Sequence, residues 1–165
     1  MFVFGIVGRK NSGKTHLVTR LLREGVTRGL RISTVKHAHH AFDVDVPGKD
    51  SWLHREAGAQ QVLVASSLRW ALMRELRGAP EPTLAALLQV LEPCDLVLVE
   101  GFKREVSRRL EVYRESCGQS PLSLEDDGID AVATDTPRSL SARPDLVLLP
   151  LDDAGAVLDH ILSRR

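Results

Sequence analysis

The N-terminal segment constrains the fold more than any other part of this 165-residue chain. An apolar run at residues 2–7 is followed at residues 8–15 by Gly-Arg-Lys-Asn-Ser-Gly-Lys-Thr, which has the spacing G-x-x-x-x-G-K-T. This spacing is typical of the phosphate-binding P-loop, in which glycines let backbone N–H groups turn inward around a phosphate. A helix that follows directs its N-terminal dipole at the same anion. A glycine turn without a ligand is the alternative, but the flanking strand and helix favour a nucleotide site.

Two side chains of this loop have expected chemical roles. The ammonium of Lys14 is expected to reach the β- and γ-phosphates of a nucleotide, and the hydroxyl of Thr15 is expected to bind Mg²⁺. Both roles follow from the positions of these residues directly after the second glycine of the motif.

Strand and helix patterns alternate along the rest of the chain, which predicts an α/β fold with a mostly parallel sheet flanked by helices. An additional antiparallel hairpin is expected where two short strand patterns are separated by Ser66-Ser67. The predicted strands are residues 2–7, 31–36, 61–65, 69–76, 95–100, 109–114, 129–134 and 146–149; the predicted helices are residues 14–28, 50–58, 83–91 and 152–163. One domain over residues 1–165 is expected for this length.

Composition excludes several classes of protein. Lys plus Arg and Asp plus Glu number 22 each, so no overall positive field attracts nucleic acid. No apolar run approaches the roughly 18 residues that span a membrane, and the N-terminus lacks the pattern of a secretory signal. Cys94 and Cys117 are the only cysteines and form no C-x-x-C pair. We therefore expect reduced thiols, a cytoplasmic location, and neither membrane nor nucleic acid as a partner.

A carboxylate is expected near the metal ion of a P-loop protein, at the end of an apolar strand. Glu100 fits this position because it ends the run Asp-Leu-Val-Leu-Val-Glu at residues 95–100. It could bind Mg²⁺ directly or through water, or orient an attacking water. A solvated acid at a strand end is the alternative. Asp45 and Asp50, in the polar segment 37–51, are competing metal partners.

The remaining polar candidates are less specific. His37, His39 and His40 could bind a transition metal, contact an anion or lie solvated in a loop. Asp135 follows a predicted strand and could accept hydrogen bonds from the N1–H and amino groups of guanine, although the motif Asn-Lys-x-Asp is absent. A turn or helix-cap aspartate is the alternative for Asp135.

With these features placed, the chain resembles the MobB family of adaptor proteins in molybdopterin-guanine dinucleotide biosynthesis. The run Val-Lys-His-Ala-His-His, followed by Pro-Gly-Lys-Asp-Ser and Arg-Glu-Ala-Gly-Ala, is more specific for this family than the P-loop is. The matching segments are residues 8–15, 35–40, 42–45, 47–51, 54–59, 95–103 and 133–135.

The resemblance implies a P-loop NTPase fold, a homodimer, binding of GTP and Mg²⁺, and weak GTP hydrolysis. It also implies a partnership with the guanylyltransferase that attaches GMP to molybdenum-bound molybdopterin; residues 37–51 are the candidate site for the pterin. It assigns nucleotide binding to Gly8, Asn11, Ser12, Gly13, Lys14, Thr15 and Asp135, catalysis to Lys14 and Glu100, and metal binding to Thr15, Glu100 and Asp45.

One position departs from the wider class of dimeric P-loop proteins, in which a second lysine often directly follows the first glycine. This chain has Arg9 there, and Lys10 comes next. Whether either residue reaches the nucleotide of a partner subunit is open from the sequence. Without such a cation, hydrolysis is expected to be slow.

Two other functions use the same loop. A small-molecule kinase would need an acceptor pocket and a mobile basic lid, for which Arg104, Arg108 and Arg109 are candidates. A metal-insertion GTPase would use the histidines, but no cysteine lies near them to complete a soft-metal site.

Overall fold

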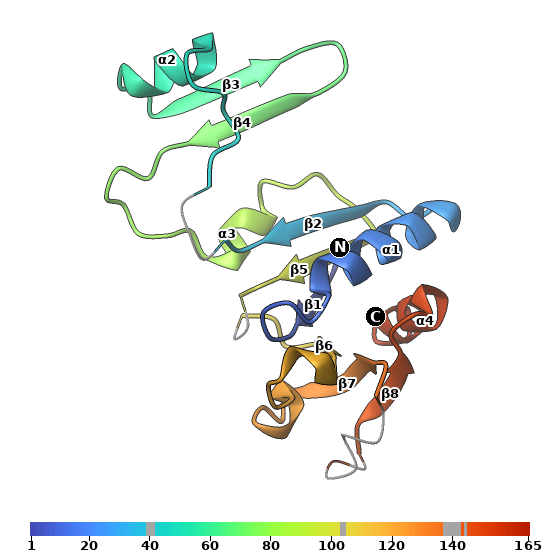
Figure 1. The fold of residues 1–165 in the computed structure, drawn as a ribbon. Coiled ribbons are helices and arrows are strands. Elements are labelled where there is room, and N and C mark those ends of the chain that lie inside the picture. The colour runs from blue at the N-terminus through green and yellow to red at the C-terminus, as the bar shows by residue number, and fades with distance from the viewer. Residues whose placement is uncertain (39–41, 103–104, 137–142, 144) are drawn as a thin grey trace. The chain divides into compact units, whose positions relative to one another are not determined.

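A computed structural model of the chain describes residues 1–38, 42–102, 105–136, 143 and 145–165. Its residues form two compact units (Figure 1). The sheet unit consists of Met1–His37 and Leu87–Arg165, and the hairpin unit consists of Ala38–Ala86. The hairpin unit is therefore an insertion in the sequence of the sheet unit. One domain over residues 1–165 stays a prediction.

The sheet unit is built on six parallel strands in the order β2-β5-β1-β6-β7-β8. Because all strands are parallel, their carboxyl ends share one edge of the sheet, which we call the carboxyl edge. The strands are β1 Phe2–Val7, β2 Ile32–Lys36, β5 Leu96–Glu100, β6 Arg109–Tyr113, β7 Ile129–Thr134 and β8 Val147–Pro150. This arrangement confirms the predicted α/β fold with a mostly parallel sheet.

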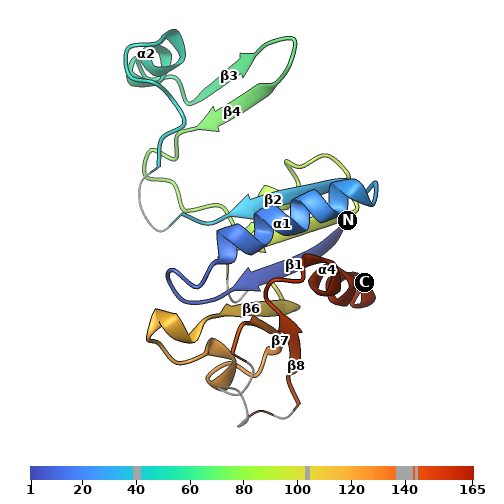
Figure 2. The same cartoon turned by 45° about the vertical axis from the view of Figure 1, so that its right-hand side comes forward.

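Two helices cover one face of this sheet and pack against each other (Figure 2). They are α1, Lys14–Thr27, and α4, Ala154–Ser163. Their apolar sides share a buried core with β1, β5 and β6; its members include Phe4, Ile6, Leu17, Leu21, Leu98, Leu110, Leu158 and Ile161. The first four residues of β5 are buried on both faces, as the continuous apolar run predicts. The core thus fixes β1 and α1, the two elements on either side of the glycine loop.

The hairpin unit contains helix α2, Asp50–Glu56, and the strands β3, Gln61–Ala65, and β4, Trp70–Arg74. The strands are antiparallel, with Val62 opposite Met73, which confirms the predicted hairpin. The turn between them is longer than the Ser-Ser pair suggests. The N–H of Ser66 donates to Arg69 O at 2.9 Å, so Arg69 belongs to the turn and β4 begins at Trp70.

Two predicted helix features are corrected. The helix expected over residues 83–91 is only α3, Leu84–Leu88, because the chain continues into short turns in which Val90 N donates to Leu87 O and Leu91 N to Leu88 O. The sequence makes Asp50 a candidate cap, but the capping residue of α2 is Lys49, and Asp50 already lies in the first turn. For the last helix, where the sequence offers Asp152 or Asp153 as the cap, Asp153 is confirmed: its side chain accepts a hydrogen bond from Ala156 N at 2.9 Å.

The polar segment 118–128 also contains regular structure. The short 3₁₀ helix η2, Leu122–Leu124, lies within it, and η1, Glu115–Cys117, directly precedes it. Both cysteines are free thiols. Within the described ranges, no helix is long and apolar enough to cross a lipid bilayer.

Arg55 holds the N-terminal segment of the hairpin unit against α2. Its two terminal nitrogens bind Asp43 Oδ1 and Oδ2 at 2.8 and 2.7 Å, and Nη1 lies 3.7 Å from Asp45 Oδ2. Asp45 Oδ1 accepts a further hydrogen bond from Ser51 Oγ at 2.7 Å. The Arg55 guanidinium holds the pKa of Asp43 well below its usual range, mainly through the side-chain hydrogen bond and also through the backbone N–H of Asp45.

This pairing predicts a pH dependence of the local stability of the hairpin unit. The folded-state pKa of Asp43 is lowered, so its contribution is fully present above the unfolded-state value of 3.8 and is lost as pH falls through the folded-state pKa. Asp43→Asn is expected to speed amide hydrogen exchange in α2 by up to about fivefold at neutral pH, because an exposed ion pair contributes modestly. Exchange rates should be corrected for their intrinsic pH dependence.

The difference in the amide exchange rates of α2 between Asp43→Asn and the wild type should become smaller at pH values well below 3.8. Glu56→Gln is the matched control, because that carboxylate is exposed and lies 4.0 Å from Arg55 Nε. Equal exchange in the wild type and Asp43→Asn at neutral pH would contradict the assigned role of the pair.

Candidate functional site

The loop after β1 adopts backbone angles that need glycine. Gly8 has φ 151° and Gly13 has φ 97°, while Asn11, at φ 64°, is a residue that tolerates the left-handed region. A Cβ on Gly8 would lie 2.5 Å from Val112 O and 2.6 Å from Ser12 Oγ. The first glycine of the motif is therefore required by close contact with β6 as well as by its angle.

The side chain of Lys14 folds back over this loop. Its Nζ donates to Gly8 O at 2.9 Å and to Arg9 O at 2.7 Å. Lys14 is also the first residue of α1, whose N-terminal cap is Gly13. The ammonium group and the positive end of the helix dipole thus act on the same small volume at the carboxyl edge, which favours an anion there.

Two hydroxyl groups of the loop fit a nucleotide phosphate and its metal ion. Ser12 is 2% exposed, and its Oγ is buried without a hydrogen-bond partner among the described residues. A buried unsatisfied hydroxyl is costly unless a ligand or water pairs with it. Thr15 lies in the exposed part of the first turn of α1, where its hydroxyl is accessible to a cation. The residues present therefore fit a magnesium-bound nucleotide.

Glu100 ends β5, the strand next to β1. It stands opposite Ile6 in the register with β1, two residues before the loop, and its side chain is 17% exposed. Lys36 Nζ lies 3.7 Å from Glu100 Oε1. The structure thus brings Glu100 to the carboxyl edge beside the glycine loop, where the sequence predicts an acid. Its role toward a metal stays a prediction.

The histidines are only partly described. The ring of His37 lies against the ring of Phe102, with centroids 4.8 Å apart, and a Cβ on Gly101 would lie 2.5 Å from His37 Cβ. His39 and His40 lie outside the described residues. Among the described residues, no group of three potential metal ligands occurs.

Asp45 belongs to the hairpin unit, where its side chain is 6% exposed and bonded to Ser51. Asp50 lies in the first turn of α2 in the same unit. Both residues keep their predicted metal roles only as predictions, because each unit of the chain is described by itself.

Asp135 follows β7 at the carboxyl edge and forms an ion pair that sequence reasoning missed. Arg114 Nη1 donates to Asp135 Oδ2 at 2.8 Å. A Cβ on Gly13 would lie 3.4 Å from Arg114 Nε, so the guanidinium lies over the last glycine of the loop. In the sequence Arg114 is only a basic residue at the end of a predicted strand. The pairing of β6 with β1 and β7 shows where it lies.

Arg9 is engaged within its own chain. Its Nη2 binds Glu125 Oε1 at 2.6 Å, and its Nε donates to Ser120 O at 3.2 Å. The neighbouring Lys10 is exposed. In this structure Arg9 therefore fastens the loop to residues 118–128.

The segment 118–128 is itself held by a fully buried acid. Glu111, on β6, accepts hydrogen bonds from the N–H groups of Leu122 and Ser123 at 2.7 and 2.8 Å. Arg109, also on β6, binds both carboxylate oxygens of Asp126 at 2.6 and 3.0 Å. Arg109 is 9% exposed, so this candidate residue for a mobile kinase lid is fixed in place.

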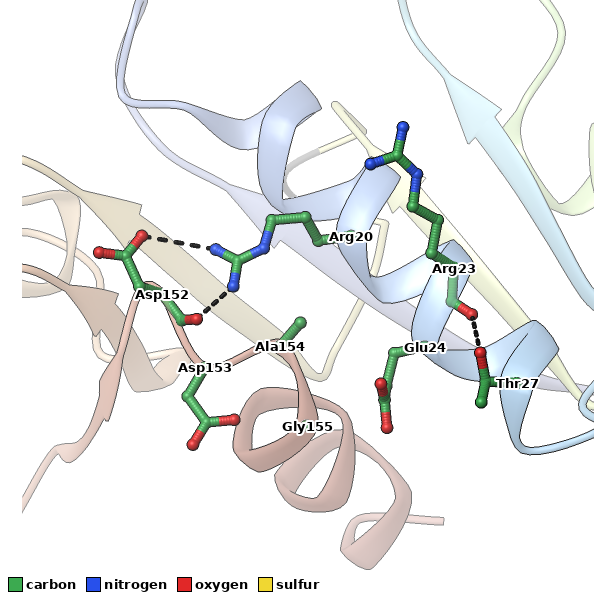
Figure 3. A pocket seen from close by; sticks show the side chains of 8 residues that line it. All are labelled: Arg20, Arg23, Glu24, Thr27, Asp152, Asp153, Ala154 and Gly155. Atoms are coloured by element: carbon green, nitrogen blue, oxygen red, sulfur yellow. Dashed lines mark hydrogen bonds and ion pairs between the residues drawn. The ribbon is translucent and has the colours of Figure 1, made fainter.

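A separate polar groove of about 590 Å³ lies between α1 and the start of α4 (Figure 3). Arg20 points across it toward Asp152 and donates to Leu151 O at 3.3 Å. The groove is lined by Arg20, Arg23, Glu24, Thr27, Asp152, Asp153, Ala154 and Gly155. Since Arg20 pairs with Asp152 across the groove and the groove contains none of the loop residues, we place the candidate site at the glycine loop.

Comparisons with known proteins show the family of this chain. The sequence profile of the family "Molybdopterin guanine dinucleotide synthesis protein B" matches residues 3–135, which include the glycine loop, Glu100 and Asp135. The chain is 40% identical over 155 residues to the molybdopterin-guanine dinucleotide biosynthesis adapter protein of Escherichia coli, covering 92% of this chain and 86% of that protein. It is also 40% identical over 162 residues to the protein of that name from Haemophilus influenzae, covering 96% and 86%.

Solved structures show the same fold. The crystal structure of Bacillus subtilis MobB superposes with a TM-score of 0.76 at 25% identity, over 99% of this chain and 98% of that one. A crystal structure of molybdopterin-guanine biosynthesis protein B gives a TM-score of 0.75 at 26% identity, over 99% and 100%. The fold is thus the P-loop NTPase fold of these proteins, and the chain belongs to the MobB family.

Proposed function

We propose that this chain is a GTP-binding adaptor in the biosynthesis of molybdopterin guanine dinucleotide, and that its partner is the guanylyltransferase that attaches GMP to the molybdopterin cofactor. The glycine loop supports this function most directly, because Lys14 lies over it and the buried hydroxyl of Ser12 faces no protein partner among the described residues. Relatives that are 40% identical are named adapter proteins of this pathway.

The proposed roles follow the chemistry of each group. Backbone N–H groups of the loop and the Ser12 hydroxyl bind phosphate, and the Lys14 ammonium neutralises the β- and γ-phosphates. Thr15 and Glu100 would hold Mg²⁺, which when bound neutralises charge on the phosphates. The Asp135 carboxylate accepts hydrogen bonds from the N1–H and amino groups of guanine. Lys14 and Glu100 support a slow hydrolysis of GTP.

One observation weighs against the kinase. A kinase needs a mobile basic lid, whereas the lid candidate Arg109 is buried and paired with Asp126. A slow GTPase is favoured because Arg9, the residue after the first glycine of the loop, is bonded to Glu125 within the chain. We further propose a cytoplasmic location, consistent with the two free thiols.

We propose that a second copy of the chain covers the hairpin. An isolated two-stranded hairpin is marginally stable in water, and β3 and β4 form a sheet of only two strands. Leu63, Leu68 and Trp70 are 62%, 86% and 58% exposed, so the hairpin presents an apolar surface. Burying such a surface in a homodimer would stabilise both copies.

The loop is tested by nucleotide affinity. With Mg²⁺ present, GTP is expected to outcompete ATP for the wild type in isothermal titration calorimetry. Lys14→Ala is expected to weaken GTP binding by at least about tenfold, because a charge-assisted hydrogen bond to phosphate is lost. Arg23→Ala is the matched control, since it removes an exposed cation from the same helix. Unchanged affinity in Lys14→Ala would remove the loop from the mechanism.

The homodimer is tested by light scattering. Leu63→Glu is expected to shift the mass from a dimer toward the 18.2 kDa monomer, because a carboxylate would have to be buried in the apolar contact. Val90→Glu, at an exposed apolar residue of the sheet unit, is the control and should leave the mass unchanged. A wild-type protein that is monomeric at all concentrations would contradict the proposed dimer.

The adaptor role is tested by reconstitution with the guanylyltransferase, measuring guanylated cofactor with and without this chain. Addition of the wild type is expected to increase the yield severalfold, whereas Lys14→Ala should give little increase. The isolated chain should hydrolyse GTP slowly throughout. Rapid phosphoryl transfer from GTP to a small metabolite by the isolated chain would instead support the kinase.

A further inference from the structure

The strand register brings a cation and an acid together at the carboxyl edge. Tyr113, the last residue of β6, stands opposite Thr134, the last residue of β7. Arg114 directly follows β6 and Asp135 directly follows β7, and parallel pairing of the two strands places these residues side by side. Their side chains meet at 2.8 Å. The pair is therefore built by the register of the sheet and does not depend on a long surface loop.

The same register places Arg114 beside the phosphate loop. β6 lies between β1 and β7, and Val112, two residues before Arg114, has its carbonyl oxygen against Gly8. The guanidinium then passes over Gly13, where Nε would lie 3.4 Å from an added Cβ. Arg114 thus connects the last glycine of the loop with Asp135 through one rigid, planar group.

We propose that Arg114 is a positioning residue for guanine recognition, which holds the Asp135 carboxylate in place from its position over Gly13. This inference rests on the proposed function, since it requires GTP to bind at the loop. It adds a residue that determines base specificity without contacting the base.

The occupancy of the two carboxylate oxygens supports this role. Oδ2 of Asp135 accepts from Arg114, and among the described residues Oδ1 has only a long contact of 3.4 Å with Thr136 Oγ1. Oδ1 therefore keeps lone pairs for a donor. Guanine offers two donors on one edge, N1–H and the amino group, whereas adenine presents an acceptor at N1. A carboxylate held in one orientation accepts from guanine and repels adenine.

Charge balance argues against Arg114 serving mainly the phosphates. The Arg114 side chain bonds to Asp135, whose negative charge offsets the guanidinium, and the two side chains are 31% and 36% exposed. A neutral, half-exposed pair contributes a weak field at the phosphates compared with Lys14, whose ammonium lies over the loop carbonyls. The expected consequence is a change in base preference with little change in affinity for the triphosphate group.

The test compares GTP and ATP affinities of the full chain, with Mg²⁺, in the wild type, Arg114→Ala, Arg114→Lys, Asp135→Ala and the double variant. Arg114→Ala is expected to lower the preference for GTP over ATP by about tenfold, the size of one charge-assisted hydrogen bond. ATP affinity should change by less than about twofold. Arg114→Lys should restore part of the preference, and the double variant should match Asp135→Ala.

Arg31→Ala is the matched control. Arg31 and Asp95 precede the neighbouring strands β2 and β5 and form a pair at the opposite edge of the sheet, with Nε 3.5 Å from Oδ2. Its loss should leave the GTP preference unchanged. Thermal unfolding checks that each variant is folded. If Arg114→Ala does not fold, the GTP and ATP affinities of Arg114→Lys provide the test.

The outcomes separate the inference from the proposed function. Equal loss of GTP and ATP affinity in Arg114→Ala would identify a phosphate contact and overturn the inference. An unchanged GTP preference would also overturn it while leaving the proposed function intact. Failure of the wild type to bind GTP would overturn both the inference and the proposed function. Lys14→Ala would then not lower GTP affinity any further.

Discussion

The close approach of Gly8 to β6 is the constraint on which the rest of the site depends. The loop can only turn where it does because Gly8 has no Cβ to meet Val112 O. This contact fixes the loop against β6, which carries Glu111 one residue before Val112 and is followed directly by Arg114, two residues after Val112. A single strand therefore locates the phosphate loop, the buried acid that holds residues 118–128 and the cation beside Asp135.

Charges around the loop are mostly paired within the chain, which matches a net charge of zero. Arg9 is bonded to Glu125, Arg109 to Asp126 and Arg114 to Asp135. These pairs give the loop a rigid frame, since each joins residues distant in sequence. The Lys14 ammonium, by contrast, lies directly over the loop carbonyls. An arrangement of this kind favours binding of a triphosphate over its rapid hydrolysis, because hydrolysis needs additional positive charge in the transition state.

Local patterns predicted the parts of the fold that are encoded locally. The glycine spacing predicted β1, the loop and α1, and the apolar run before Glu100 predicted a strand buried on both faces. The helix over residues 83–91 was wrong in length, since leucines at helical spacing do not specify where helical hydrogen bonding stops. Arg114 could not be found from the sequence, because its importance comes from the register of β6 against two other strands, which is a non-local property.

The position of Lys14 has a consequence for how the site discriminates among ligands. Its ammonium already has two carbonyl acceptors, Gly8 O and Arg9 O, at hydrogen-bond distance. A phosphate that draws this ammonium inward must replace those bonds with stronger charge-assisted ones. A neutral ligand or one with a single negative charge gains little from that exchange, whereas a triphosphate with Mg²⁺ gains more. In the proposed function the loop therefore selects for the charge of the phosphate chain, and selection of the base comes from the separate group at Asp135, held by Arg114.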